Sequence, residues 1–194
     1  NLEIIIVDNG SNDGSIEFIS ELDNNKYIKI FLPENKGSSI GHSEGMKNAK
    51  GKYVLTLDDD AYIKPSSLKV AVDILENNTK LGVIGFGLVN PNVNFSEDDY
   101  NSQTLVSEAS YDLCFNTINY TSASIFRNEA LIKCGYMDDD WDWSTRTEDL
   151  ELNFNIIAHG YNGVLIPELR AYHKASPSNR NAEVLTINGI HGVI

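Results

Sequence analysis

Short apolar runs alternate with helical patterns through the first half of the chain, and this alternation constrains the fold more than any other feature. Strands are predicted at residues 2–7, 27–32, 53–57 and 81–89, and helices at 16–22, 35–48 and 65–75. Ser15 is expected to cap the first helix. Strand–helix–strand units with short loops produce a parallel sheet covered by helices on both faces. We therefore predict an α/β fold with a mostly parallel sheet.

The second half of the chain is less regular. A polar stretch predicts an irregular, exposed insertion at residues 90–120, and an acidic loop with two tryptophans follows at 138–147. Further elements are predicted as strands at 121–126 and 163–166, helices at 128–133 and 150–158, and an extended segment at 170–173. A length of 194 residues suits one domain, 1–194, with a real core.

An acidic run, Asp58-Asp59-Asp60, directly follows the apolar strand that begins at Tyr53. Adjacent carboxylates repel one another and lose hydration energy when they are partly buried. A cation relieves this repulsion, and hard divalent ions such as Mg²⁺ or Mn²⁺ prefer carboxylate oxygens. The run thus predicts a metal site, although a solvated acidic turn has the same composition.

Charge and composition exclude several kinds of partner. The formal net charge is −13, whereas nucleic acids and anionic membrane surfaces need a basic face. The chain has no apolar run long enough to span a bilayer. Cys114 and Cys134 are too few for a disulfide framework, and we expect both thiols to be reduced, which favours a cytoplasmic location.

Polar residues follow two of the predicted strands at the edge where parallel α/β sheets bind ligands. Asp8, Asn9, Gly10 and Ser11 form the first of these groups, and Asp8 can accept a hydrogen bond from a base or a ribose. The segment Asn35-Lys36-Gly37 opens a helix whose unpaired N–H groups suit an anion. A turn closed by Asx-type hydrogen bonds is the simpler explanation of the first group.

A second acidic group opens the helix near residue 150. Glu148 and Asp149 follow the loop that carries Trp141 and Trp143. Acidic residues in a first helical turn compensate the helix dipole, but a carboxylate near a hydroxyl can also act as a general base. Exposed tryptophans suit the apolar face of a sugar ring. His173 lies near the end of the chain and, taken alone, is typical of a structural histidine.

The order of these motifs resembles a known family. From Leu2 to about Ser176 the chain reads DNGSNDGS, ENKG, GKYVLTLDDDAYIKP, GYMDDDWDWSTRTEDLEL and AYHKASP. This order is similar to that of the inverting nucleotide-sugar glycosyltransferases of GT-A fold, glycosyltransferase family two. The resemblance implies a Rossmann-like sheet and an N-terminally truncated domain, because the family's first unit, V-x-V-x-I-P-T-Y-N, has no counterpart here.

The resemblance also implies a role for each motif. Asp60 and His173 are expected to bind the metal, and Trp141 and Trp143 the acceptor. Asp149 is expected to be the catalytic base, with Glu148 as the fallback. The residues expected to bind the nucleotide are Asp8, Asn9, Gly10, Ser11, Asn35, Gly37 and Asp58. Asp59 is expected to be a spectator. The expected cofactor is Mn²⁺ or Mg²⁺.

These roles predict a metal-dependent hexosyltransferase that moves a sugar, most readily from a UDP-sugar, to a hydroxyl group of a saccharide or glycolipid acceptor with inversion. Polysaccharide or glycoconjugate synthesis is the expected setting, and any membrane association is expected to come from parts outside this chain. The alternative is a non-catalytic nucleotide- or carbohydrate-binding module. In favour of that alternative, the helix reads Ile40-Gly41-His42-Ser43-Glu44-Gly45 where relatives often have Ala-Arg-Asn-x-Gly.

Overall fold

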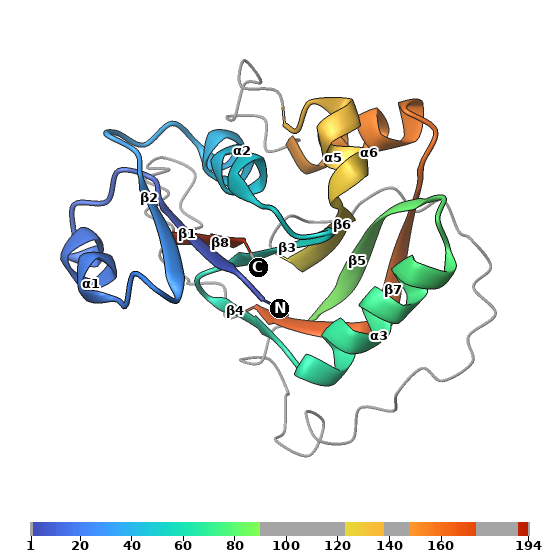
Figure 1. Cartoon of the computed structure of the whole chain (residues 1–194), viewed down its shortest axis with the longest axis horizontal. Coiled ribbons are helices and arrows are strands. Elements are labelled where there is room, and N and C mark those ends of the chain that lie inside the picture. Colours follow the sequence, from blue (N-terminus) through green and yellow to red (C-terminus); the bar gives the residue numbers. More distant parts are fainter. Residues whose placement is uncertain (1, 90–122, 138–147, 174–189, 194) are drawn as a thin grey trace.

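The computed structural model describes residues 2–89, 123–137, 148–173 and 190–193 (Figure 1). The predicted insertion at 90–120 and the loop at 138–147, with Trp141 and Trp143, lie outside these residues.

Strands and helices alternate through the first half of the chain, as predicted. The elements are β1 (Ile4–Asp8), α1 (Ser15–Glu21), β2 (Tyr27–Phe31), α2 (Ser38–Asn48), β3 (Tyr53–Asp58), β4 (Ala61–Ile63), α3 (Pro65–Asn77) and β5 (Leu81–Val89). The remaining ones are β6 (Ala123–Arg127), α5 (Asn128–Cys134), α6 (Glu148–Ala158), β7 (Asn162–His173) and β8 (Ile190–Val193). The short strands β4 and β8 were not predicted.

All the described strands form one sheet in the order β2-β1-β8-β3-β6-β5-β7-β4. The pairings make β1, β2, β3, β5 and β7 run in one direction and β4, β6 and β8 in the other. The sheet is therefore mixed, and most of its described strands run in the same direction. Because β1 and β3 run the same way, their carboxyl ends, Asp8 and Asp58, lie at the same edge.

Helices cover both faces of this sheet, as predicted (Figure 1). Successive residues of β3 show the division: Val54 belongs to the core under α2, α5 and α6, and Leu55 to the core under α3. Side chains of a strand alternate between faces, so a strand covered on both sides must be apolar at consecutive positions. This requirement explains why β3 has apolar residues at the consecutive positions Val54 and Leu55.

Strand β7 joins two segments that were predicted separately. It pairs with β5 in parallel, but the register shifts between the pair Phe86–Ile166 and the pair Gly87–Arg170. Pro167 lies within this shift, where its missing N–H costs no ladder hydrogen bond. A Cβ at position 87 would lie 2.4 Å from the Pro167 carbonyl oxygen, so glycine is required at the bulge.

The prediction that Ser15 caps α1 is wrong. The capping position is Gly14, with φ +95°, and Ser15 is already the first helical residue. The Asp13 carboxylate accepts hydrogen bonds from the Ser15 amide at 3.1 Å and from its hydroxyl at 2.6 Å. Asp13 therefore supplies the acceptor for the helix start, and its own pKa is lowered by these hydrogen bonds.

Cys134 is a buried free thiol at the end of α5. Burial raises the pKa of this thiol, which favours the inert, protonated form. Cys114 lies outside the described residues, so the reduced state expected for both thiols stays a prediction. Among the helices that are described, none is long and apolar enough to cross a membrane.

Arg127 joins three parts of the fold through its buried guanidinium group. It donates to the carbonyl oxygens of Leu81 at 2.8 Å, Leu75 at 2.7 Å and Asn78 at 3.1 Å. We expect Arg127→Met to lower the free energy of unfolding by about 3 kcal/mol, because buried carbonyls lose charged donors. Thermal denaturation would then show a decrease in Tm of roughly 6–12 °C.

Lys52→Met is the matched control for this stability prediction. Lys52 pairs with Glu76 at 2.6 Å, but both side chains are exposed to solvent. Such a pair is screened by water and contributes little to the free energy of unfolding. Equal shifts in Tm for the two variants would contradict the role given to Arg127.

Candidate active site

Asp8 ends β1 with a fully buried carboxylate. Its Oδ2 accepts hydrogen bonds from the backbone amides of Gly10 at 3.1 Å and Ser11 at 3.0 Å. Its Oδ1 is also buried and has no hydrogen-bond partner among the described residues. Leaving a buried carboxylate oxygen unsatisfied is costly, so this atom suits a hydrogen bond donated by a ligand.

The turn after Asp8 packs against the turn that begins α2. Asn9 donates from Nδ2 to the Gly37 carbonyl at 2.8 Å and to Asn35 Oδ1 at 3.2 Å, and its Oδ1 accepts from the Lys36 amide at 3.1 Å. Gly10 has φ +74°, and a Cβ there would lie 2.4 Å from the Glu34 carbonyl carbon. The structure thus brings together the two polar segments that were predicted to share a ligand.

Two carboxylates, Asp58 at the end of β3 and Asp60 two residues later, form a cluster with His173 at the end of β7. The side chains of this cluster carry the kinds of oxygen and nitrogen atoms that bind metal ions. His173 Nε2 lies 2.8 Å from Asp60 Oδ1 and 3.6 Å from Asp58 Oδ2. One ligand atom from each of these residues lies within 4.8 Å of the others, and all three side chains are half-buried. Asp59 is exposed and is not part of this cluster.

Pairing between β4 and β7 brings His173 to the acidic run. Ala61 is opposite His173 in this antiparallel ladder, one residue after Asp60. Stacking of the Tyr62 and Tyr172 rings, 5.0 Å apart, supports the same pair of strands. Strand β4 has three residues, too few to show a period, which is why sequence spacing alone does not reveal this contact.

Asp149 lies in the first turn of α6 and is half-buried. Its backbone carbonyl accepts a hydrogen bond from Asn153 at 2.6 Å. Within the described parts of the chain, it is not a member of the cluster of acids and histidine that could share a metal ion. The role of Asp149 as a base, with Glu148 as the fallback, therefore stays a prediction.

His42 is a site residue that sequence reasoning did not assign. It lies in α2, is 2% exposed, and its Nε2 is 3.7 Å from Asp58 Oδ1. A histidine placed four residues after Ser38, in a helix that begins at the turn predicted to bind the nucleotide, was the available signal. Sequence reasoning noted it only as a departure from the usual arginine.

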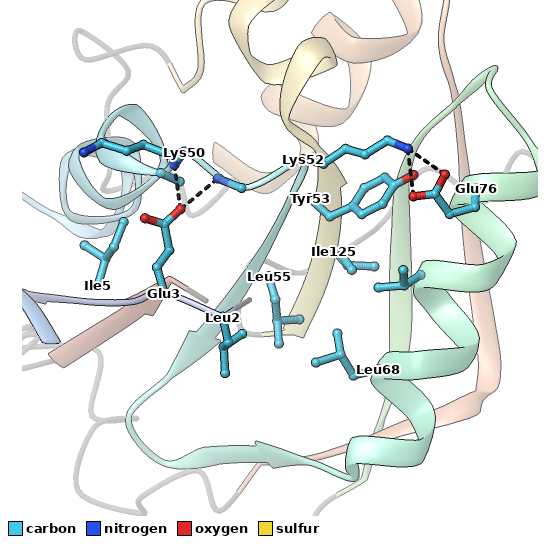
Figure 2. Close-up of a pocket in the computed structure, with 13 residues that line it drawn as sticks. Leu2, Glu3, Ile5, Lys50, Lys52, Tyr53, Leu55, Leu68, Glu76 and Ile125 are labelled. Atoms are coloured by element: carbon cyan, nitrogen blue, oxygen red, sulfur yellow. Dashed lines mark hydrogen bonds and ion pairs between the residues drawn. The ribbon is translucent and has the colours of Figure 1, made fainter. Parts of the chain in front are cut away.

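A cavity of about 580 Å³ lies away from this cluster, at the amino ends of the strands (Figure 2). Leu2, Leu55, Leu68 and Ile125 line its apolar part. At its rim, Glu3 Oε1 accepts hydrogen bonds from the amides of Lys50 and Gly51, each at 2.7 Å. Since Asp8 and Asp58 are at the opposite, carboxyl ends of β1 and β3, we do not include this cavity in the candidate site.

Comparison with known protein families identifies the family of this chain. The family model described as "Glycosyl transferase family 2" matches residues 1–139, which is more than half of the chain. The chain belongs to glycosyltransferase family 2. The family expected from the order of motifs is therefore confirmed.

Curated relatives in this family include poly-beta-1,6-N-acetyl-D-glucosamine synthases. The enzyme of Staphylococcus aureus strain COL is 27% identical over 169 residues, which cover 82% of this chain and 39% of that protein. The Staphylococcus epidermidis enzyme is 28% identical with the same coverage. The chain thus spans about two fifths of the length of these family 2 relatives.

Solved glycosyltransferase structures confirm the GT-A-type α/β fold. The mannosyltransferase PcManGT from Pyrobaculum calidifontis, in complex with GDP-Man and Mn²⁺, has a TM-score of 0.65 at 21% identity. That comparison covers 91% of this chain and 48% of PcManGT. S. aureus TarS 1–349, in complex with UDP-GlcNAc, has a TM-score of 0.63 at 17% identity over 90% of this chain and 50% of the TarS 1–349 chain.

Proposed function

We propose that this chain is the catalytic domain of a metal-dependent, inverting glycosyltransferase. It would transfer a sugar from a nucleoside diphosphate donor to a hydroxyl group of a saccharide or glycolipid, in polysaccharide or glycoconjugate synthesis. The observation that carries this proposal is the Asp58–Asp60–His173 cluster. It lies at the same sheet edge as the buried Asp8 carboxylate and the Asn35–Gly37 turn.

The cluster suits Mn²⁺ or Mg²⁺. Two carboxylates and one imidazole offer oxygen and nitrogen ligands, a set that Mn²⁺ accepts well. Neighbouring ligands of an octahedral ion with bonds of about 2.1 Å lie roughly 3 Å apart. The distances from His173 Nε2, 2.8 Å to Asp60 and 3.6 Å to Asp58, are close to this spacing. Asp60 and His173, the two metal ligands that the resemblance implies, would hold the ion together with Asp58, which the resemblance assigned to the nucleotide.

Asp8 suits a nucleobase that carries a ring N–H. Its Oδ1 is an acceptor without a donor among the described residues, and uracil, thymine and guanine each present such an N–H group. The TarS structures in complex with UDP and with UDP-GlcNAc support a UDP-sugar. GDP, as in the PcManGT complex, and TDP satisfy the same hydrogen bond.

In the proposed reaction, Asp149 accepts the proton of the acceptor hydroxyl while that oxygen attacks the anomeric carbon of the donor sugar. The bond from this carbon to the diphosphate oxygen breaks, and its electron pair leaves with the nucleoside diphosphate. When bound, a divalent ion neutralises negative charge on that leaving group. Attack on the face opposite the leaving group inverts the anomeric carbon in one displacement.

Other parts of the proposal concern the acceptor and the location. Trp141 and Trp143 are proposed to contact the acceptor saccharide, as their place before Asp149 suggests. The name of the poly-beta-1,6-N-acetyl-D-glucosamine synthases supports a role in polysaccharide synthesis. The buried free thiol of Cys134 supports a cytoplasmic location.

A donor-hydrolysis screen tests the function. The full-length protein is incubated with UDP-, GDP- and TDP-sugars, with and without Mn²⁺, and release of the nucleoside diphosphate is measured. We expect release from one donor class, and we expect it to require the metal ion. Nucleotide binding without turnover of any donor, in the presence of varied saccharide acceptors, would favour the non-catalytic module instead.

Asp8→Asn is expected to weaken UDP binding by about 10- to 100-fold, the equivalent of a lost hydrogen bond to a charged group. The amide oxygen of Asn can still accept from Gly10 and Ser11, but its NH₂ group replaces the acceptor that faces the base. Isothermal titration calorimetry with UDP and Mn²⁺ measures this loss.

Asp23→Asn is the control for this measurement. Asp23 accepts a backbone hydrogen bond from Asn25 at 2.9 Å in an exposed turn, so the chemical change is the same away from the site. It should leave UDP binding unchanged. Wild-type affinity in Asp8→Asn would show that Asp8 does not contact the base.

A further inference from the structure

The buried face of α2 is unusually polar. Ser39, His42 and Ser43 are each at most 2% exposed, and Met46 is the one large apolar residue that is buried beside them in this helix. Helices normally bury an apolar stripe, because burial of polar side chains costs free energy unless they are paired. Core packing alone therefore does not explain why these polar side chains are buried, and the groups that they contact must be considered.

His42 and His173 lie near different carboxylate oxygens of Asp58. Its Nε2 lies 3.7 Å from Asp58 Oδ1, whereas His173 Nε2 lies 3.6 Å from Asp58 Oδ2. Both distances are in the range of ion pairs and are longer than a direct hydrogen bond. Asp58 thus has a histidine at each carboxylate oxygen, and only one of these histidines belongs to the predicted metal ligands.

The turn of α2 that carries His42 is anchored to a distant part of the chain. The neighbouring Ser43 donates from Oγ to the Met137 carbonyl at 3.2 Å and accepts from the Met137 amide at 3.2 Å. Both residues are buried, at 0% and 2% exposure. The imidazole of His42 is therefore presented to Asp58 from a fixed backbone.

We propose that His42 is a positioning residue for the metal site. It holds Oδ1 of Asp58 so that Oδ2 faces Asp60 and His173, where the ion would bind. This inference rests on the proposed function, since it assumes that Asp58, Asp60 and His173 take a divalent ion. Partners of this kind orient carboxylate ligands in metal sites, and their removal typically weakens metal binding by about 10- to 100-fold.

The test compares two substitutions of similar size that differ in hydrogen bonding. His42→Leu removes the ring nitrogen that lies beside Asp58 Oδ1, and we expect Mn²⁺ to bind this variant about 10- to 100-fold more weakly. His42→Gln keeps an N–H donor at a similar reach and should recover most of the lost affinity. Mn²⁺ affinity is measured by isothermal titration calorimetry on the full chain, without donor, and thermal denaturation checks that each variant folds.

His159→Ala is the matched control, because His159 is an exposed histidine at the other end of α6 from Asp149. It should bind Mn²⁺ as the wild type does. If His42→Leu does not fold, His42→Asn replaces it, since the shorter amide cannot reach Asp58 and should also lose affinity.

Two outcomes would overturn the role of His42. Wild-type Mn²⁺ affinity in His42→Leu, or in His42→Asn where that variant replaces it, would show that Asp58 needs no support from α2. Equal losses in the Gln and Leu variants would show that His42 acts through packing alone. Failure of the wild-type protein to bind Mn²⁺ is a different result, because it removes the metal site on which the proposed function depends.

Discussion

Asp149→Asn is expected to abolish sugar transfer while donor binding stays close to that of the wild type. Asparagine has the same shape as aspartate but cannot take the proton of the acceptor hydroxyl. General base catalysis contributes about 10²- to 10⁴-fold to such reactions, and we expect the transfer rate to fall by this factor. The measurement is the rate of transfer at saturating donor, together with donor affinity by calorimetry.

Asp73→Asn is the control for this variant. Asp73 is an exposed residue of α3, so the same loss of charge occurs away from the proposed site. Transfer at the wild-type rate by Asp149→Asn would show that Asp149 is not the base. Glu148→Gln would then be measured, and a loss of transfer in that variant would assign the base to Glu148.

Asp60→Ala is expected to remove donor turnover with little loss of stability. Asp60 is 32% exposed and follows the end of β3, so its truncation leaves no cavity in the core. Its pair with His173 is partly solvated, and we expect a change of no more than about 1 kcal/mol in the free energy of unfolding. Loss of a metal ion that stabilises the leaving group costs several kcal/mol, or on the order of 10²- to 10³-fold in rate.

Asp59→Ala is the closest control that the chain offers. Asp59 is the neighbouring carboxylate, it is exposed, and it is outside the cluster. Donor hydrolysis and Mn²⁺ titration should separate the two variants, with Asp59→Ala near the wild type. Equal activity in both variants would contradict the metal site, and equal loss in both would indicate a general effect of negative charge.

Strand ends explain how much of the site is visible in the sequence. Asp8 and Asp58 each follow a long apolar run, and the rule that parallel strands present their carboxyl ends at one edge was enough to place them together. The contact of Asn9 with Asn35 and Gly37 follows from the same rule. These placements need only the direction of the strands and no long-range packing.

Pairings that involve short or reversed strands were not predicted from the sequence pattern, and only the family resemblance assigned Asp60 and His173 to the same metal ion. The approach of His173 to Asp60 needs β4, which has three residues, and its pairing with β7. Strand β8, which lies between β1 and β3, has four residues and no distinctive periodicity. Sequence patterns of this length are too short to show a period, so tertiary pairing decides whether they form strands. His42 was missed for a related reason, because the role proposed for it depends on its distance to Asp58, which lies on another element.

The ladder between β4 and β7 has a consequence for the whole domain. Asp60 precedes β4 and His173 ends β7, so the chain between them includes α3, β5, β6, α5 and α6. An ion bound by both residues would close this long loop and act as a cross-link. Because folding brings these two residues together, an ion that binds them in the folded chain and not in the unfolded chain stabilises the folded state by mass action. The ion proposed to activate the donor would thus also stabilise the folded arrangement of the second half of the domain. Binding of one ion would therefore be required both for donor turnover and for the full stability of the fold.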